Sequence, residues 1–281
     1  MVPHTLIPNL LTIAGTDPTG GAGIQADLKT FSALGAYGMS VITAVVAQNT
    51  RGVRAVTPMT PDCVAAQIDA VFDDVRVDAV KIGMLHNEGI IAAVASRLRH
   101  YRPAYIVLDP VMMAKSGDHL LDPNAISALK TQLLPAVTLV TPNLPEAAAL
   151  LGALEAQSDD DIRAQLHEFS KLGARATLLK GGHSHDPAVS TDWLSDMARA
   201  EDEPIAFTSP RIVTQCDHGT GCTLSAAIAA LLPHHDLIRA IRCAKTYLDG
   251  ALSAAKALSV GQGHGPLHHF HAIWPTHPAA R

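Results

Sequence analysis

The sequence predicts an α/β fold of three layers, in which helices cover both faces of a central, mostly parallel β-sheet. Short apolar runs of strand length alternate with longer segments whose apolar residues recur at helical spacing. A glycine-rich loop joins the first strand to the first helix, and a second strand follows, as in a right-handed parallel crossover. No linker or repeat interrupts the 281 residues, so we expect one domain over residues 1–281, with a core from about 11 to 270.

Local features place each element. The apolar run 9–15 predicts the first strand, and apolar residues at helical spacing predict a helix over 24–34 that Gly35 ends. Thr60, Asp122 and Ser158 can open later helices. Further strands are expected at 38–47, 78–83, 105–108, 137–140 and 174–180, short edge hairpin strands at 189–194, 205–207 and 211–213, and further helices at 61–75, 87–100, 122–134, 158–172, 221–232 and about 237–258.

Composition argues against several classes of function. The net charge is only -5 and aromatic residues make up 4%, so neither a field that captures nucleic acid nor a stacking surface for single strands is expected. No apolar stretch approaches a membrane span, and the N-terminus lacks the pattern of a signal peptide. The four cysteines show no disulfide or zinc spacing. We expect a soluble cytoplasmic protein without nucleic-acid or membrane partners.

Polar residues and glycines follow the predicted strands. Open parallel sheets bind ligands outside the carboxyl ends of their strands. Acidic residues beside a phosphate site suggest Mg²⁺, which takes only one or two carboxylates, and such an assembly suits phosphoryl transfer. The residues at these ends are Gly15, Gln48, Gly83, Met84, Asp109, Asn143, Glu146, Lys180 and the turn 219–222.

The turn formed by Gly219, Thr220 and Gly221 precedes an apolar helix. Unpaired N–H groups and the helix dipole make such a turn a site for an anion, especially phosphate. Cys222 stands in the first turn of this helix, where the same field predicts a lowered thiol pKa. Taken alone, these residues also fit a plain loop before a helix with a buried cysteine.

Two nucleotide-binding patterns near the first glycine loop are incomplete. Residues 21–26 fit G-x-G-x-x-A, but the second strand ends at Gln48-Asn49 instead of in the acid that binds a ribose. Residues 23–30 nearly fit a P-loop, but Leu28 occupies the place of the second glycine. An NAD-dependent dehydrogenase is therefore disfavoured.

Asp27 lies on the same predicted helical face as Phe31 and Leu34. A buried carboxylate is costly without a partner, so this position indicates a binding role. A partly exposed acid near the helix start is an equally good interpretation of this residue alone.

Histidines cluster near the C-terminus, and a metal site there is conceivable. No cysteine or carboxylate accompanies them at ligand spacing, which favours a solvated, structural role. The cluster is His264, His268, His269 and His271, with a separate pair at His234-His235.

Seven segments, in order, resemble the hydroxymethylpyrimidine/phosphomethylpyrimidine kinases of thiamine biosynthesis, a family of the ribokinase-like superfamily. The resemblance spans about residues 11–270 and implies a ribokinase-like fold, a homodimer, and ATP- and Mg²⁺-dependent phosphorylation of 4-amino-5-hydroxymethyl-2-methylpyrimidine and of its monophosphate. The segments are 14–27, 43–50, 80–85, 108–112 with Lys115-Ser116-Gly117, 141–146, 179–183 and 218–223.

The resemblance also implies a role for individual residues. Cys222 occupies the place of the aspartate base of the superfamily's sugar kinases, and would accept the proton of the substrate hydroxyl or position that hydroxyl. Asp27 would bond the amino group or a nitrogen of the pyrimidine ring. The other implied contacts are an anion hole of Gly219, Thr220 and Gly221, a pyrimidine site of Gly15, Gln48, Met84 and Val111, ATP contacts from Asn143 and Lys180, and Mg²⁺ contacts from Asp109 and Glu146.

Cys216-Asp217 departs from the family, which often has Asn-Thr or Asp-Thr there, so no contact is transferred to these two positions. The main alternative is a pyridoxal kinase of the same superfamily. A non-catalytic pyrimidine-binding protein is a third hypothesis, and the acids, lysine and cysteine at the strand ends argue against it.

Overall fold

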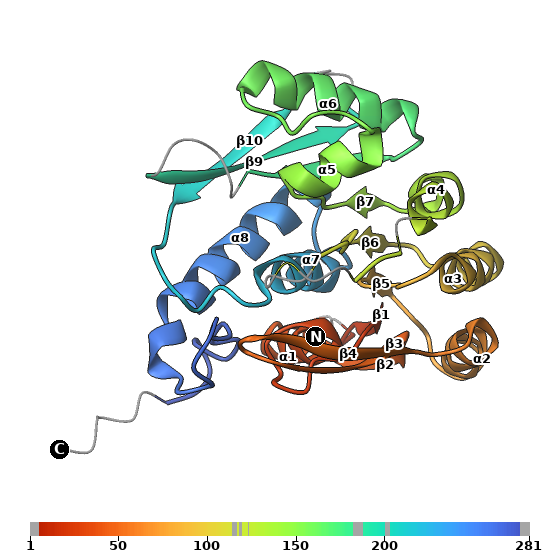
Figure 1. Ribbon diagram of the computed structural model, residues 1–281, viewed down its shortest axis with the longest axis horizontal. Coiled ribbons are helices and arrows are strands. Elements are labelled where there is room, and N and C mark those ends of the chain that lie inside the picture. The colour runs from red at the N-terminus through yellow and green to blue at the C-terminus, as the bar shows by residue number, and fades with distance from the viewer. Residues whose placement is uncertain are drawn as a thin grey trace, which may run out of the picture.

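The structure is a computed structural model that describes residues 6–113, 117, 120–122, 124–181, 188–199 and 203–275. Among these residues, one sheet holds eight strands (Figure 1). In this sheet the neighbouring pairs β2–β1, β1–β5, β5–β6, β6–β7 and β7–β8 are parallel, and β9 and β10 add an antiparallel edge. The predicted α/β class with edge hairpin strands is therefore confirmed. In spatial order the strands are β10 (Ile205–Pro210), β9 (Val189–Asp196), β8 (Ala176–Lys180), β7 (Leu139–Val140), β6 (Ile106–Leu108), β5 (Ala79–Ile82), β1 (Asn9–Ala14) and β2 (Tyr37–Ile42).

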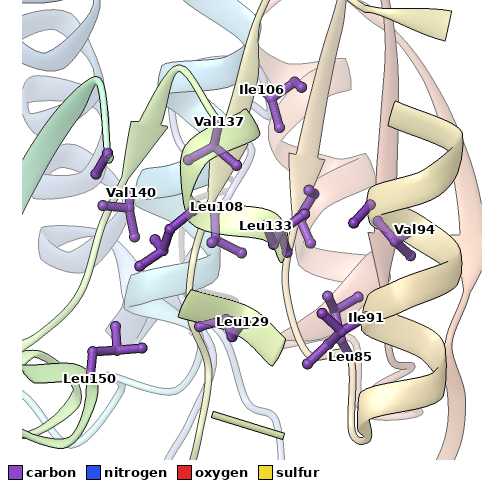
Figure 2. Close-up of a cluster of buried hydrophobic side chains, with 14 of the residues drawn as sticks. Leu85, Ile91, Val94, Ile106, Leu108, Leu129, Leu133, Val137, Val140 and Leu150 are labelled. Carbon is purple, nitrogen blue, oxygen red and sulfur yellow. The ribbon is translucent and has the colours of Figure 1, made fainter. Parts of the chain in front are cut away.

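Helices cover both faces of this sheet (Figure 1). One apolar cluster lies between the sheet and α2 to α6. Figure 2 shows part of it, with Leu129 and Leu133 drawn between Leu108 of β6 and the α3 residues Ile91 and Val94. A second cluster lies between the sheet and α1, α7 and α8. The helices are α1 (Gly23–Ala33), α2 (Pro61–Phe72), α3 (Glu88–Tyr101), α4 (Ala125–Ala128, continued by a π-helical turn at Leu129–Leu133), α5 (Leu144–Leu151), α6 (Asp159–Lys171), α7 (Thr220–Leu231) and α8 (Leu237–Ser253).

Several helices begin at side-chain caps. The side chains of Thr60 and Ser158 each accept a bond from the backbone N–H three residues on, as the sequence predicts. Asn87 caps α3 in the same way. Each such cap stabilises a helix by about 1 kcal/mol. No helix of the described residues is long and apolar enough to span a bilayer.

The prediction of a single strand over residues 38–47 is wrong. Thr43 interrupts it, because its N–H bonds to Ala14 O and its hydroxyl donates to Met84 O, both at the ends of neighbouring sheet strands. The chain then leaves the sheet, and β3 (Ala44–Asn49) pairs with β4 (Gly52–Pro58) as a separate antiparallel hairpin. The residues on both sides of Thr43 are mostly apolar, so their periodicity alone could not reveal the break.

Two smaller predictions also fail. Residues 211–213 form no strand, because β10 ends at Pro210, although Arg211 N–H still bonds to Ala188 O. The last long helix ends at Ser253, before the predicted 258, and a 3₁₀ turn (Ala255–Ala257) follows it.

Candidate active site

The parallel strands bring the predicted phosphate-site residues together. Lys180, the last residue of β8, places its Nζ 2.8 Å from Asp109 Oδ1, directly after β6. A Cβ atom on Gly221 would lie 3.2 Å from Lys180 Nζ and 3.3 Å from Asp109 Oδ2. The glycine turn therefore lies against a lysine and a carboxylate that are far away in the sequence.

Glu146 and Asn143 form a capping box at the start of α5. Asn143 Oδ1 accepts the Glu146 N–H at 2.8 Å, and Glu146 Oε2 accepts the Asn143 N–H at 2.9 Å. Because the cap occupies Oδ1 of Asn143, its side-chain N–H groups are the atoms suited to a phosphate. Glu146 Oε2 lies 3.9 Å from Lys180 Nζ, so this box adjoins the Lys180–Asp109 pair.

The Asp109 and Glu146 carboxylates fit a magnesium ion. Burial and the negative charge of Asp109 raise the pKa of Glu146 to about 7, although Lys180 opposes this shift. A cation between the two acids would relieve that repulsion. Among the described residues no group of three or more His, Cys, Asp or Glu side chains could hold a metal. Mg²⁺ needs no such group, since it commonly combines one or two carboxylates with waters and substrate phosphates.

The glycine turn is fixed by close packing. Gly219 has a φ of 87°, in the left-handed region that favours glycine, and a Cβ there would overlap the backbone oxygen of Gly21. Thr220 then begins α7, whose first N–H groups have no partners within the helix. The predicted anion hole is thus a helix N-terminus held against the first glycine loop.

The predicted lowering of the Cys222 thiol pKa is wrong. Burial raises this pKa to about 11, and the positive charge of Lys81 and the N–H of Gly23 counter it only in part. Cys222 is half-buried as a residue, and enough protein surrounds its thiol that desolvation outweighs these contacts. In the free protein Cys222 therefore carries its proton at neutral pH.

Sequence reasoning missed Lys81. It lies in β5 with its side chain fully buried, and its Nζ is 2.9 Å from Asp27 Oδ2. Burial alone would lower the pKa of Lys81, but the negative charge of Asp27, together with that of Asp109, raises it above its ordinary value. A lysine inside an apolar strand requires a buried partner. This requirement is the signal by which Lys81 could have been found from the sequence.

Asp27 is buried, as its position on the helix predicts. Its Oδ2 accepts from Thr12 Oγ1 at 2.6 Å and from Lys81, whereas its Oδ1 is buried and has no partner among the described residues. Burial raises the pKa of Asp27 despite both donors. Lys81 Nζ also lies 3.0 Å from where a Cβ on Gly83 would stand, which places this ion pair directly beneath the strand ends.

The apolar side of the site lies under the β3–β4 hairpin. A Cβ on Gly15 would overlap Cε of Met84, so these two predicted residues are in contact. Met84 packs with Ala44 and Val46 of the hairpin, and Val111 lies against the same cluster. Gln48, the fourth predicted residue of the pyrimidine site, is near enough to Asp17 to lower the pKa of that carboxyl.

The C-terminal histidines are not uniformly solvated. His269 is buried, its Nε2 is 3.1 Å from Thr223 Oγ1, and burial lowers its pKa to about 4. The predicted solvated role is therefore wrong for His269. The motif residues Lys115, Ser116, Gly182 and His183 lie outside the described residues.

Comparison with known proteins gives a consistent result. The sequence profile of phosphomethylpyrimidine kinase matches residues 17–268. The chain is 57% identical over 267 residues to the hydroxymethylpyrimidine/phosphomethylpyrimidine kinase of Escherichia coli, covering 95% of this chain and 98% of that protein. It is similar in structure to a Bacillus subtilis pyridoxal kinase in complex with ADP, with a TM-score of 0.86 and 35% identity over 95% of this chain and 99% of that one. It is also similar to a phosphomethylpyrimidine kinase from Clostridium difficile, with a TM-score of 0.75 and 41% identity over 87% of this chain and 99% of that one.

Proposed function

The chain belongs to the phosphomethylpyrimidine kinase family, and on this premise we propose how its residues phosphorylate hydroxymethylpyrimidine and then its monophosphate in thiamine biosynthesis. The observation that carries the proposal is the position of the glycine turn. It touches the Lys180–Asp109 pair, and at Cys222 it approaches the Lys81–Asp27 pair. The Cys222 thiol therefore lies next to both the proposed phosphate site and the Lys81–Asp27 pair, whose carboxylate suits a heteroaromatic ring.

The ATP phosphates lie along the Lys180 ammonium, the Asn143 amide and the N–H groups that open α7. These fixed donors match the charge on the equatorial oxygens of the transferring group, so positioning and charge neutralisation do most of the catalysis. Asp109 and Glu146 would hold Mg²⁺. The ion would supply further neutralisation of the phosphate charge.

The pyrimidine lies between Met84 and Val111, with Gly15 leaving room for the ring. The unpartnered Asp27 Oδ1 accepts from the ring amino group, and Gln48 offers a donor and an acceptor to the ring edge. Pyridoxal has no amino group to give this carboxylate. This contact, together with the 57% identity to a pyrimidine kinase, favours the pyrimidine over the pyridoxal alternative.

The thiolate form of Cys222 accepts the proton of the substrate hydroxyl as that oxygen attacks the γ-phosphorus in line. Lys81 supports the thiolate by charge, and the N–H of Gly23 supports it by a hydrogen bond. Because phosphoryl transfer passes through a loose transition state, the hydroxyl proton has to leave only as the new P–O bond completes.

Gly15→Ala is expected to raise the KM for hydroxymethylpyrimidine at least about tenfold while the KM for ATP stays within about twofold. The new Cβ displaces only the flexible end of Met84, so we expect the fold to survive and the pyrimidine wall to move. Steady-state kinetics with each substrate varied in turn measures both constants. Gly15→Ala/Met84→Ala is the matched control, because it removes the displaced side chain and should recover part of the loss. An unchanged pyrimidine KM in the single variant would remove Gly15 from the site.

Three further proposals follow, of which only the homodimer rests on the family resemblance. We propose a single domain, a cytoplasmic location and a homodimer. One sheet joins strands from residue 9 to residue 210, which supports the single domain. Tyr37 and Val45 are exposed apolar side chains on β2 and β3 that offer a surface to a second copy. Sedimentation equilibrium tests the dimer, and a purely monomeric protein at micromolar concentration would rule it out.

A further inference from the structure

Asp17 and His218 join two loops of the site that are separated by 201 positions in the chain. His218 Nε2 lies 2.8 Å from Asp17 Oδ2, and the Asp17 side chain is completely buried. Burial alone would raise the pKa of the Asp17 carboxyl, but bonds from His218, Gln48 and Thr19 hold it well below its ordinary value. The Asp17 carboxyl is therefore held in its ionised form, as an acceptor for these donors.

The Asp17 carboxylate also organises its own loop. Oδ1 accepts from the N–H and the hydroxyl of Thr19, and Oδ2 accepts from the N–H groups of Gly21 and Ala22. The next residue, Gly23, begins α1, and its N–H is near enough to the Cys222 thiol to lower the pKa of that group. One carboxylate thus fixes the chain immediately before the donor that faces the thiol.

His218 fixes the other side of the same contact. Its backbone N–H bonds to Gly265 O, and its ring packs so closely that a Cβ on Gly21 would lie 2.6 Å from its Cδ2. Gly219 follows in its left-handed conformation against the Gly21 oxygen, and Cys222 stands three residues further on. The start of α7 is therefore held against the start of α1, with the thiol between the two helix N-termini.

We propose that Asp17 and His218 are a positioning pair that sets the anion-hole turn and the Cys222 sulfur for phosphoryl transfer. Neither side chain touches the reacting atoms. Asp17 acts through the Gly23 N–H, and His218 acts through the backbone of the turn. The inference rests on the proposed roles of the turn and of Cys222.

His218→Phe tests the pair, because it keeps a ring of similar size and removes the N–H donor. Asp17 retains its bonds from Thr19, Gly21 and Ala22, so we expect the variant to fold. Loss of a hydrogen bond to a charged group predicts a fall in kcat of about 10- to 100-fold. Both KM values should stay within about threefold, since the lost contact acts in the transition state. His218→Gln, which can still donate to Asp17, should recover most of the kcat.

His264→Ala is the matched control. His264 Nδ1 pairs with Oδ1 of Asp217, the residue before His218, at 2.8 Å. The His264 side chain is exposed, and exposed ion pairs contribute little to stability. Its kcat should match that of the wild type. If His218→Phe does not fold, His218→Asn, which is too short to keep the bond, replaces it with the same expected loss.

Alkylation of Cys222 by iodoacetamide, with the modified peptide identified by mass, gives a readout independent of turnover. A loosened turn should make this thiol react several-fold faster in His218→Phe than in the wild type or in His218→Gln. The positioning role would be overturned if the kcat of His218→Phe stayed within twofold of the wild-type value. It would also be overturned if His218→Phe and His218→Gln lost kcat equally. If the wild type phosphorylates no pyrimidine, the proposed function fails, and the alkylation rates still decide whether the pair holds the thiol.

Discussion

Cys222→Ala is expected to lower kcat by about 10²- to 10⁴-fold, the usual contribution of a general base. The KM for the pyrimidine should change by no more than about threefold, because the thiol serves the transferring proton and not the ring. Mixing the variant with Mg-ATP and hydroxymethylpyrimidine under single-turnover conditions measures the chemical step. A rate close to that of the wild type would remove Cys222 from the mechanism.

The pH dependence of the same reaction separates a base from a residue that only positions the hydroxyl. With a thiol pKa of about 11, the thiolate fraction grows about tenfold for each pH unit above 7. The kcat/KM of the wild type should therefore rise with pH between about 7 and 9, and that of Cys222→Ala should rise much less over the same range. A flat wild-type profile would favour a positioning role for the protonated thiol.

Lys81→Met is expected to destabilise the protein by about 3–5 kcal/mol, because it leaves the buried Asp27 carboxylate without its countercharge. Domains of this kind are stable by only about 5–15 kcal/mol, so the loss is a large part of the total. Urea unfolding followed by circular dichroism measures it. The variant should also lose turnover, since the charge that favours the Cys222 thiolate is gone.

The matched control is Lys81→Met/Asp27→Asn, which removes both buried charges. It should regain much of the lost stability, since the penalty comes from one uncompensated charge. Lys245→Met provides a second comparison, because Lys245 Nζ pairs with buried Asp192 Oδ2 at 2.6 Å and neither group is among those that shift the pKa of Cys222. It should lower stability without affecting the reactivity of Cys222. A cost below about 1 kcal/mol for Lys81→Met would show that Asp27 is neutral in the folded protein.

The order of elements could be predicted because each strand and helix carries its own periodicity and caps. The run at residues 38–47 shows the limit of this reasoning. Its residues are mostly apolar, and the tertiary bonds of Thr43 divide it into β2 and β3. The β3–β4 hairpin, which covers the proposed pyrimidine site, was therefore missed, although its residues Gln48 and Asn49 had been singled out.

The residues of the site were predicted in two different ways. The strand-end rule selected Asp109, Glu146 and Lys180 from their positions, and the structure brings them together. The roles assigned to individual residues came from the family resemblance, and they remain proposals. The Cys222 pKa was predicted with the wrong sign because the sequence shows the helix field but not the degree of burial.

Contacts between distant residues were beyond the sequence. Asp17 and His218 are 201 positions apart, and nothing in either segment indicates that they meet. Lys81 and Asp27 are 54 positions apart. Each is unusual by itself, however, because one is a lysine within an apolar strand and the other an acid on an apolar helix face. The sequence alone would have permitted the inference that these two buried charges pair with each other.

The most direct test of the account uses purified protein with Mg-ATP and, in parallel, hydroxymethylpyrimidine, its monophosphate and pyridoxal, with products identified by mass. The account predicts the pyrimidine diphosphate from both pyrimidines and much less product from pyridoxal. Pyridoxal phosphate as the only product would contradict it, because the unpartnered Asp27 oxygen and its neighbours would then serve a ring without an amino group.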